Sequence, residues 1–319
     1  MTRRDLLAAT ITGALPRGGA AFAAASQPST PVNFGIPPHA CDCHTHIIGD
    51  AAGFPFFAGR TYTPEPALPA EMSAVHRALH IERVVIVTPS VYGTDNSATL
   101  YGMKARGRNA RGIAVIDEKT PDNLLDSMGK AGVRGIRLNL VDSAQGGLEA
   151  GRRRFQAAAQ RMKVRDWHIQ IFTSPAVISG MKDLVGESPV PVVFDHFAGA
   201  NAALGVQQTG FADVLELVRS GKAWVKVSGA YRASAQAPDY PDAAPLAKAL
   251  IGTNPDRIIW GTDWPHPDSS PRAGRRPTDL APLLQIDDGR MLNQLAVWAP
   301  DAKVRKKILV DNPALLYGF

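Results

Sequence analysis

Two histidines stand two residues apart in the stretch Cys41-Asp42-Cys43-His44-Thr45-His46. Side chains of a strand alternate between its two faces, so Asp42, His44 and His46 are predicted to share one face, with the cysteines and the threonine on the other. Two imidazoles on one face could hold one metal ion or one substrate oxygen between them. The plainer alternative is a strand that ends in two partly exposed histidines, and this stretch alone does not decide between them.

The elements that must position these side chains recur along the chain. Eight short runs rich in Val, Ile and other strand formers are bounded by turn residues: Asp42 to Ile47, Arg83 to Thr88, Gly112 to Asp117, Gly135 to Leu140, Trp167 to Thr173, Val190 to His196, Ala223 to Ser228 and Arg257 to Asp263. Helical patterns between them include Pro69 to Leu79, Pro121 to Ala131, Leu148 to Val164, Phe211 to Ser220 and Tyr240 to Ile251.

This alternation of strand and helix, repeated at intervals of about thirty residues, predicts an α/β protein with a distorted (β/α)8 TIM barrel. A doubly wound open sheet is the runner-up. No Gly-x-Gly-x-x-Gly or phosphate loop follows any predicted strand, so nothing supports the nucleotide chemistry usual for that sheet.

Active sites of such barrels gather at the carboxyl ends of the strands. The first predicted strand ends in His44 and His46, the sixth in Asp195-His196 and the eighth in Asp263. We therefore predict His44, His46, His196 and Asp263 as catalytic residues. Asp195 is expected to face outward, because His196 takes the inward phase.

Other strand ends add further polar residues: Ser90 after the second, Arg137 and Asn139 on the fourth, and Lys226 and Ser228 on the seventh. The long loop from Gly53 to Glu65, which contains Tyr62, is expected over the mouth of the barrel. Among the remaining histidines, His168 is predicted in the core and His39, His76 and His80 at the surface or in loops. His266 follows Asp263 closely, and its position stays open.

Three motifs together resemble the amidohydrolase superfamily: Asp-x-His-x-His on the first strand, Phe194-Asp195-His196 on the sixth, and Gly261 to Pro267 on the eighth. More narrowly they resemble the branch that contains 2-pyrone-4,6-dicarboxylate lactonase, 4-sulfomuconolactone hydrolase and D-galactarolactone isomerase. The resemblance covers residues 38–319. It implies an amidohydrolase-like barrel and a hydrolase that acts on a cyclic ester.

Metal-dependent members of that superfamily add a lysine or glutamate at the end of strand four and a histidine at the end of strand five. Here the fourth strand offers Arg137 and Asn139, and the fifth offers Gln170 and Phe172. The lactonase branch works without a bound metal, so the resemblance implies metal-free catalysis with no cofactor. The alternative is one zinc ion held by the four predicted catalytic residues, because zinc accepts nitrogen and carboxylate ligands.

The mechanism that these residue types suggest is hydrolysis of a lactone. Asp263 would accept a proton from a water molecule as that water attacks the ring carbonyl. The three histidines would donate hydrogen bonds to the carbonyl oxygen as it gains charge. Arg137 suits a substrate carboxylate, because its planar fork can grip both oxygens. Tyr62, Ser90 and Asn139 are predicted to contact the rest of the substrate.

The arginines that hold a second carboxylate in the pyrone-dicarboxylate lactonase pattern have no counterpart in Leu140 to Ser143 or Phe197 to Ala200. An anionic lactone with one carboxylate, or a sugar-acid lactone, is therefore favoured as the small-molecule substrate. Two alternatives use the same residues: isomerisation between sugar-acid lactones, and non-catalytic binding of acidic sugars by an exported protein.

The composition is that of an ordinary globular protein, with 45% apolar and 20% charged residues in 319. The net charge of +6 favours anionic partners, but the only arginine run is Arg152-Arg153-Arg154, so no nucleic-acid partner is expected. The oligomeric state is not indicated by the sequence.

The first residues follow the order of an export signal. Arg3-Arg4 precede the apolar run Leu6 to Leu15 and the small residues Ala20 to Ala25, which resembles a twin-arginine signal. We predict an export signal over 1–27, a linker over 28–40 and the barrel over 41–319, with a periplasmic location. A cytoplasmic protein with an untargeted leader is the alternative. The apolar run is too short to span a membrane.

Overall fold

The computed structural model describes residues 25–140, 147–270 and 272–319. Eight parallel strands form one sheet in the order β1-β3-β4-β5-β6-β7-β8-β9. They are β1 Cys41–Thr45, β3 Arg83–Val87, β4 Ala110–Ala114, β5 Val133–Asn139, β6 His168–Phe172, β7 Val192–Phe194, β8 Ala223–Ser228 and β9 Ile258–Gly261.

The sheet closes on itself. The backbone N–H of Asp263 donates to the carbonyl of His44, and that of His46 to the carbonyl of Trp264, both at 2.8 Å. These bonds join the segment after β9 to β1. The (β/α)8 barrel is therefore confirmed, and the open doubly wound sheet is wrong.

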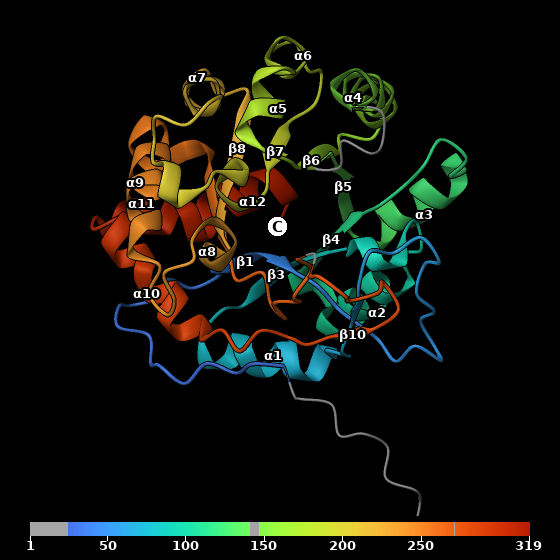
Figure 1. The fold of residues 1–319 in the computed structure, drawn as a ribbon, viewed down its shortest axis with the longest axis horizontal. Helices are drawn as coiled ribbons and strands as arrows, with labels where there is room; N and C mark the ends of the chain where they lie inside the picture. The colour runs from blue at the N-terminus through green and yellow to red at the C-terminus, as the bar shows by residue number, and fades with distance from the viewer. Residues whose placement is uncertain (1–24, 141–146, 271) are drawn as a thin grey trace, which may run out of the picture.

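Helices surround the strand ring (Figure 1). They are α1 Pro69–Ala78, α2 Ser97–Arg106, α3 Asp122–Ala131, α4 Gly147–Lys163, α5 Pro175–Ser179, α6 Lys182–Gly186, α7 Phe211–Arg219, α8 Ala230–Ala233, α9 Ala244–Thr253, α10 Asp288–Trp298, α11 Ala302–Lys306 and α12 Asn312–Tyr317. Each helix predicted from the sequence has its counterpart here. In α7 the buried residues Phe211, Val214, Leu217 and Val218 recur at helical spacing, which is why this segment forms an amphipathic helix.

The barrel interior is packed and forms no pore. Val85, Val87 and Ile113 lie in one buried cluster with the ring of Tyr317 from the last helix. That ring also contacts His168, with 5.2 Å between the ring centroids. In Figure 1 the carboxyl terminus accordingly lies at the centre of the strand ring. The filled interior leaves the strand carboxyl ends as the place for a site.

Strand β1 departs from the predicted alternation of faces. Its pairing with β3 shifts register between Asp42 and Thr45. Asp42 Oδ2 lies 3.2 Å from His76 Nε2, and Thr45 Oγ1 lies 3.5 Å from Met72 Sδ, so both side chains point toward α1. The predicted shared face for Asp42 and His44 is therefore wrong, because an extra residue in a strand reverses the phase beyond it.

His76 also corrects a prediction. It is fully buried against Asp42 instead of lying at the surface or in a loop. Its place on α1 explains the error, because the helix turns this residue toward the barrel with its neighbours Met72 and Val75. His39 and His80 are exposed as predicted.

Residues 25–40 have no regular secondary structure, yet they pack on the barrel. The indole N–H of Trp264 donates to the carbonyl of Ser26 at 3.1 Å. Asp287 accepts hydrogen bonds from the backbone and side chains of Ser29 and Thr30. Residues 1–24 of the predicted export signal lie outside the described residues, whereas the segment predicted as a linker is hydrogen-bonded to α10.

The loop predicted over the mouth is also ordered by pairing. Its short strand β2 Thr63–Pro64 pairs with β10 Leu280–Ala281. Tyr62 is buried in a cluster with Val91 and Tyr92. This loop therefore brings Tyr62 to the segment that follows β3.

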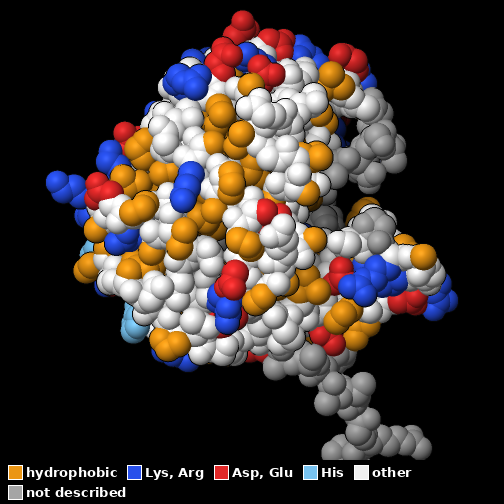
Figure 2. Space-filling view, turned by 60° about the vertical axis from the view of Figure 1, so that its left-hand side comes forward, with side chains coloured by type: hydrophobic (Ala, Val, Ile, Leu, Met, Phe, Trp, Pro, Cys, Tyr) orange, Lys and Arg blue, Asp and Glu red, His pale blue; other side chains and the backbone are white. Residues whose placement is uncertain are grey.

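On the face drawn in Figure 2, basic and acidic side chains are interspersed and no single basic patch stands out. Within the described ranges, none of the helices has both the length and the apolar character needed to cross a membrane.

Candidate active site

Three imidazoles converge on one carboxylate oxygen. The Nε2 atoms of His44, His46 and His196 lie 3.6, 3.4 and 3.7 Å from Oδ1 of Asp263. All four side chains are buried. The structure thus brings together the four residues predicted as catalytic, although 219 positions separate His44 from Asp263 in the sequence.

Backbone geometry makes this convergence possible. A Cβ on Gly261 would lie 2.7 Å from the backbone nitrogen of His44, so only glycine lets β9 approach β1 this closely. His196 and Asp263 have φ angles of 46° and 67°, in the left-handed region that non-glycine residues rarely adopt. Such conformations cluster at functional sites, where the surrounding structure holds them.

The opposite ring nitrogen of each histidine has its own partner. Nδ1 of His46 lies 2.7 Å from the carbonyl oxygen of Val87, and a carbonyl only accepts, so Nδ1 carries the proton. Nδ1 of His196 lies 2.9 Å from Ser228 Oγ and 3.4 Å from the Ser228 carbonyl. His44 Nδ1 has a hydrogen bond of 3.3 Å with Lys226 Nζ and lies 3.2 Å from Asp195 Oδ1. Each Nε2 is thereby directed to the centre of the site.

Asp263 is fixed through its second oxygen. Oδ2 accepts a hydrogen bond of 2.6 Å from the Tyr231 hydroxyl and a second from Nε of Arg232, which forms an ion pair with it. Although burial raises the pKa of Asp263, the charge of Arg232 holds it well below its usual range. Asp263 is therefore an anion at neutral pH, with Oδ1 facing the histidines.

His44 and His196 are neutral at the same pH. Burial, together with the charge of Lys226, holds the pKa of His44 well below its usual range. Burial lowers the pKa of His196 to about 4. A neutral imidazole with its proton on Nδ1 offers a lone pair at Nε2, so donation from Nε2 to a substrate oxygen requires a second proton on the ring.

Asp195 faces inward, and the predicted outward orientation is wrong. It is fully buried, and its carboxylate contacts His44, Lys226, Gln170 and Arg137. Val193 already points into the barrel, so two residues later Asp195 does too. His196 points to the same side because its backbone is left-handed. The alternation of side chains along a strand does not predict this conformation. Burial raises the pKa of Asp195, but His44, Lys226 and Arg137 hold it well below its usual range.

Three of the predicted substrate-binding residues, Arg137, Tyr62 and Ser90, are linked to this site by their contacts. Arg137 donates from Nε to Asp195 Oδ2 at 3.0 Å, and its guanidinium carbon lies 5.1 Å from the centre of the Phe172 ring. Burial raises the pKa of the Tyr62 hydroxyl, while Arg232, Arg137 and a hydrogen bond with Ser90 lower it. Tyr62 and Ser90 are thus placed beside two guanidinium groups.

Asn139 ends β5 half-buried, and its carbonyl accepts a hydrogen bond of 3.2 Å from Arg154 of α4. His266, left open by the sequence, is fully buried with Nε2 3.1 Å from Asp288 Oδ2. His168 is in the core as predicted, and burial lowers its pKa to about 3. Neither histidine faces Asp263 Oδ1.

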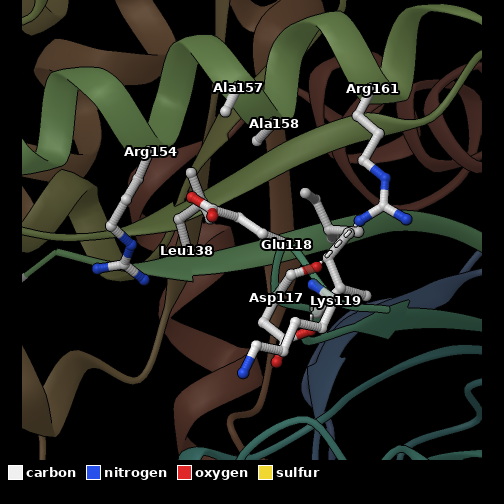
Figure 3. A pocket seen from close by; sticks show the side chains of 10 residues that line it. Asp117, Glu118, Lys119, Leu138, Arg154, Ala157, Ala158 and Arg161 are labelled. Atoms are coloured by element: carbon white, nitrogen blue, oxygen red, sulfur yellow. Dashed lines mark hydrogen bonds between the residues drawn. The ribbon is translucent and has the colours of Figure 1, made fainter. Parts of the chain in front are cut away.

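A separate hollow of about 380 Å³ lies between α4, strand β5 and the segment that follows β4. Figure 3 shows Ala157 and Ala158 of α4 above it, with Arg154 and Arg161 toward its two ends. Arg161 is already engaged, since Nη1 donates to the carbonyl of Asp117 at 2.9 Å. The hollow contains none of the residues predicted for catalysis.

Three donors of the histidine site, from His44, His46 and Asp263, lie close enough together to hold one zinc ion, whereas His196 falls in a second group with His44 and Asp195. Tetrahedral zinc with bonds of about 2.0–2.1 Å separates its ligand atoms by about 3.4 Å, close to the distances between Asp263 Oδ1 and the three Nε2 atoms. Within the described residues, the buried Oδ1 of Asp263 has no hydrogen-bond partner. One atom each of His44, His46 and Asp263 lies within 4.8 Å of the others, the spacing of a metal-binding group. Partners on Nδ1 are also typical of metal-binding histidines.

The sequence model of the amidohydrolase family matches residues 41–319. The chain is 35% identical to 4-sulfomuconolactone hydrolase of Rhizobium radiobacter, over 91% of this chain and 93% of that protein. It is 33% identical to 2-pyrone-4,6-dicarboxylate hydrolase of Comamonas testosteroni, with 92% and 94% covered. It is 27% identical to D-galactarolactone isomerase of Agrobacterium fabrum, with 90% and 94% covered.

Among solved structures, an Agrobacterium tumefaciens protein without ligand superposes with a TM-score of 0.75 at 24% identity, covering 90% of this chain and 98% of that one. The fold and the family match agree, and the chain belongs to the amidohydrolase family. The resemblance stated from the three strand-end motifs is thereby confirmed.

Tyr231 and Arg232, which bind Asp263 directly, were not predicted from the sequence. Both lie on the short helix α8, just after β8. Gly229 precedes them with φ 57°, and a Cβ there would lie 3.2 Å from Asp263 Oδ2. A glycine directly after a strand-end serine was the available signal for a turn close to the site.

Proposed function

We propose that the protein hydrolyses an anionic lactone. The observation that carries the proposal is the convergence of three imidazole Nε2 atoms on Oδ1 of Asp263, beside Arg137, at the carboxyl ends of barrel strands. The two relatives at 33% and 35% identity are named as hydrolases of lactones, which supports this reaction.

In the proposed reaction Asp263 is the base. Its Oδ1 is ionised and turned toward the three histidines, so a water molecule between them could pass a proton to it while attacking the ring carbonyl. The ring C–O bond then breaks, and the ring oxygen takes the proton from Asp263 and leaves as a hydroxyl group. The products are a free carboxylic acid and that hydroxyl on one open chain.

Arg137 supports an anionic substrate. Its hydrogen bond to Asp195 uses Nε, which leaves the two terminal nitrogens to face a carboxylate. Arg232 adds a second guanidinium near Tyr62. We propose a lactone with one carboxylate or a sugar-acid lactone. Residues 140–143 and 197–200 contain no arginine that could bind a second carboxylate.

Metal-free catalysis stays a prediction, and the zinc alternative has support from the geometry. If a zinc ion is bound, His44, His46, His196 and Asp263 would hold it, and it would polarise the carbonyl and lower the pKa of water. If none is bound, the imidazoles must take a second proton before they can donate to the carbonyl oxygen. The two possibilities therefore differ in their response to a chelator.

A panel of lactones tests the proposal. Purified protein is incubated with carboxylate-bearing, sugar-acid and uncharged lactones, with and without a chelator, and acid release is followed. We expect release from anionic lactones and little from uncharged ones. Absence of release from every lactone, with the protein folded, would reject the proposal. Loss of activity with the chelator and its return with zinc would reject metal-free catalysis.

Isomerisation is the second candidate, because the chain also resembles a D-galactarolactone isomerase at 27% identity. A substrate hydroxyl would then replace water as the nucleophile, with the same base. Accumulation of a second lactone instead of an open acid would indicate this reaction. Binding of acidic sugars without turnover is the remaining alternative, and an unchanged ligand after incubation would indicate it.

We also propose export by the twin-arginine route to the periplasm. Arg3-Arg4 and the small residues before Ser26 support this route. The hydrogen bond from Trp264 to Ser26 favours cleavage before Ser26, which is two residues earlier than the predicted end of the signal at residue 27. Replacing Arg3 and Arg4 with lysine should trap the precursor inside the cell, and unchanged export would refute the proposal.

A further inference from the structure

The barrel closes where β1 meets the segment that follows β9. We call residues 42–46 and 260–264 the two halves of the closing seam. His44 and His46 lie on the first half and Asp263 on the second, so the distances of 3.6 and 3.4 Å from their Nε2 atoms to Asp263 Oδ1 run across the seam. The spacing of the two halves therefore sets the position of the proposed base relative to two of its three histidines.

The side chain of Asp42 bridges the two halves of the closing seam. Its Oδ1 accepts hydrogen bonds from the backbone N–H of His44 at 3.1 Å and from that of Thr262 at 3.0 Å. Its Oδ2 accepts a hydrogen bond of 2.6 Å from the Thr262 hydroxyl. Asp42 is fully buried, and Thr262 is buried as well. One side chain thus binds both a residue that carries a predicted catalytic imidazole and the residue directly before the proposed base.

Sharing one oxygen fixes how far apart the two halves of the seam lie. Both backbone N–H groups donate to the same Oδ1 of Asp42, so neither half can shift without lengthening one of the two bonds. Gly261 leaves room for this contact, since a Cβ there would lie 3.1 Å from Asp42 Oδ1. The Thr262 hydroxyl also accepts from the backbone N–H of Trp264 at 3.0 Å, which holds the turn around Asp263. A buried network whose members are hydrogen-bonded in this way is rigid.

His76 makes the matched contact from outside the seam. Its Nε2 lies 3.2 Å from the same Oδ2 of Asp42 that accepts from Thr262. His76 belongs to α1, which carries none of the residues predicted for catalysis or substrate binding. Loss of the His76 contact should therefore weaken the packing of α1 and leave the spacing of the two halves of the seam in place.

We infer that Asp42 is a positioning residue that fixes the spacing between the two histidines of the first half of the seam and the proposed base Asp263. Its side chain points toward α1, away from Asp263 Oδ1, so it acts through the residues whose backbone it binds. The effect on catalysis rests on the proposed function. The bridge between the two halves of the seam does not.

Two variants of Asp42 that nearly keep its shape separate hydrogen bonding from packing. Asp42→Asn keeps an oxygen for the two backbone N–H groups, while its amide can donate to the Thr262 hydroxyl and to Nε2 of His76, since both of these can accept. Asp42→Leu fills similar space and accepts no hydrogen bond.

Kinetics are measured on the lactone that the panel identifies. We expect kcat within about threefold of the wild-type value for Asp42→Asn and about 100-fold lower for Asp42→Leu, because a misplacement of about 1 Å can cost that much. KM should change little in both variants. Equal kcat values for the two variants, with the protein folded by circular dichroism, would overturn the inference.

A matched pair of variants provides the test if Asp42→Leu does not fold. Thr262→Val and His76→Leu each remove one partner of Asp42 Oδ2, and only Thr262 lies in the seam. We expect kcat to fall about 10-fold at unchanged KM in Thr262→Val and to stay within about twofold of wild type in His76→Leu, even where both lower the melting temperature. The same kcat in both variants would assign Asp42 a structural role alone and overturn the inference.

Amide hydrogen exchange tests the bridge without any substrate. Peptides that cover residues 42–46 and 260–264 of the full-length protein are followed by mass spectrometry. We expect both to exchange faster in Asp42→Leu and, to a smaller extent, in Thr262→Val, and to exchange as in the wild type in Asp42→Asn and His76→Leu. Unchanged exchange in Asp42→Leu and Thr262→Val would overturn the bridge. A wild-type protein that hydrolyses no lactone would reject the proposed function alone, because the exchange of these peptides does not depend on turnover.

Discussion

Buried histidines meet carboxylates in two regions of this barrel, and the contacts differ. On the outer side of the strands, His76 faces Asp42 at 3.2 Å and His266 faces Asp288 at 3.1 Å, one ring to one carboxylate. At the strand ends, three rings face the single Oδ1 of Asp263. Residue type and burial are the same in both regions.

The difference lies in the balance of donors and acceptors. An outer pair can share one proton between nitrogen and oxygen. At the strand ends, Val87 and Ser228 contact Nδ1 of His46 and His196, so the Nε2 atoms of these rings and Oδ1 of Asp263 face one another as acceptors and need a cation, a proton or a water molecule between them. We conclude that convergence, and not the presence of a histidine beside an aspartate, marks the reactive region.

The largest expected effect comes from replacing Asp263, and the same replacement of Asp288 in an outer pair is the comparison. Asp263→Asn removes the proposed base and should lower kcat on the lactone by about 100- to 10,000-fold, with the far-ultraviolet circular dichroism unchanged. Asp288→Asn, the matched change in an outer pair, should retain activity within about tenfold. Wild-type activity in Asp263→Asn would remove that residue from the mechanism.

A smaller effect is expected from replacing Arg137, the residue of the inner region that is proposed to bind the substrate carboxylate. Arg137→Lys loses the planar fork and should lower kcat/KM about 10- to 100-fold for a carboxylate-bearing lactone, since hydrogen bonds to charged groups contribute about 1.5–3 kcal/mol. An uncharged lactone, if turned over slowly, is the control and should respond much less. Equal losses on both substrates would show that Arg137 acts only through Asp195.

Acid should weaken the fold through neutral buried histidines. The pKa values of His196 and His168 are lowered to about 4 and about 3, below the value of about 6.5 in an unfolded chain. The unfolded state therefore binds more protons below pH 6.5, and each group lowers the free energy of unfolding by up to about 1.4 kcal/mol per pH unit. Urea denaturation at pH 7, 6 and 5 measures this. A free energy that stays constant over that range would contradict it.

The smallest effect is expected next to the outer pair, at Asp287. Its carboxylate caps α10 through Gly289 and Arg290 and binds Ser29 and Thr30 of the amino-terminal segment. Asp287→Ala should lower the free energy of unfolding by about 1–2 kcal/mol, the range for a lost helix cap, with kcat unchanged. Thermal denaturation checks the first value. A fall in kcat without loss of stability would show that this segment influences the site.

Much of this arrangement was predictable because strand periodicity and barrel topology are local signals. Hydrophobic runs located all eight strands, and the rule that barrel sites lie at strand carboxyl ends selected His44, His46, His196 and Asp263. The rest depended on backbone irregularities. The register shift in β1 turned Asp42 away from His44, and the left-handed backbone at His196 let Asp195 face inward beside it.

Side-chain contacts between different strands and helices could not be predicted from the sequence either. Nothing in the local sequence of Lys226 or Gln170 indicates that they contact Asp195. The contacts form only when β6, β7 and β8 lie side by side in the sheet. Tyr231 and Arg232 lie on a helix of four residues, too short for a periodic signal.

Hydrolysis in ¹⁸O-labelled water tests the central claim most directly. The wild-type protein is given a carboxylate-bearing lactone, and the product is analysed by mass spectrometry. The account predicts an open-chain acid with one ¹⁸O atom in the new carboxyl group, formed at a rate that Asp263→Asn loses. An unlabelled second lactone, or a substrate that remains unchanged, would contradict it.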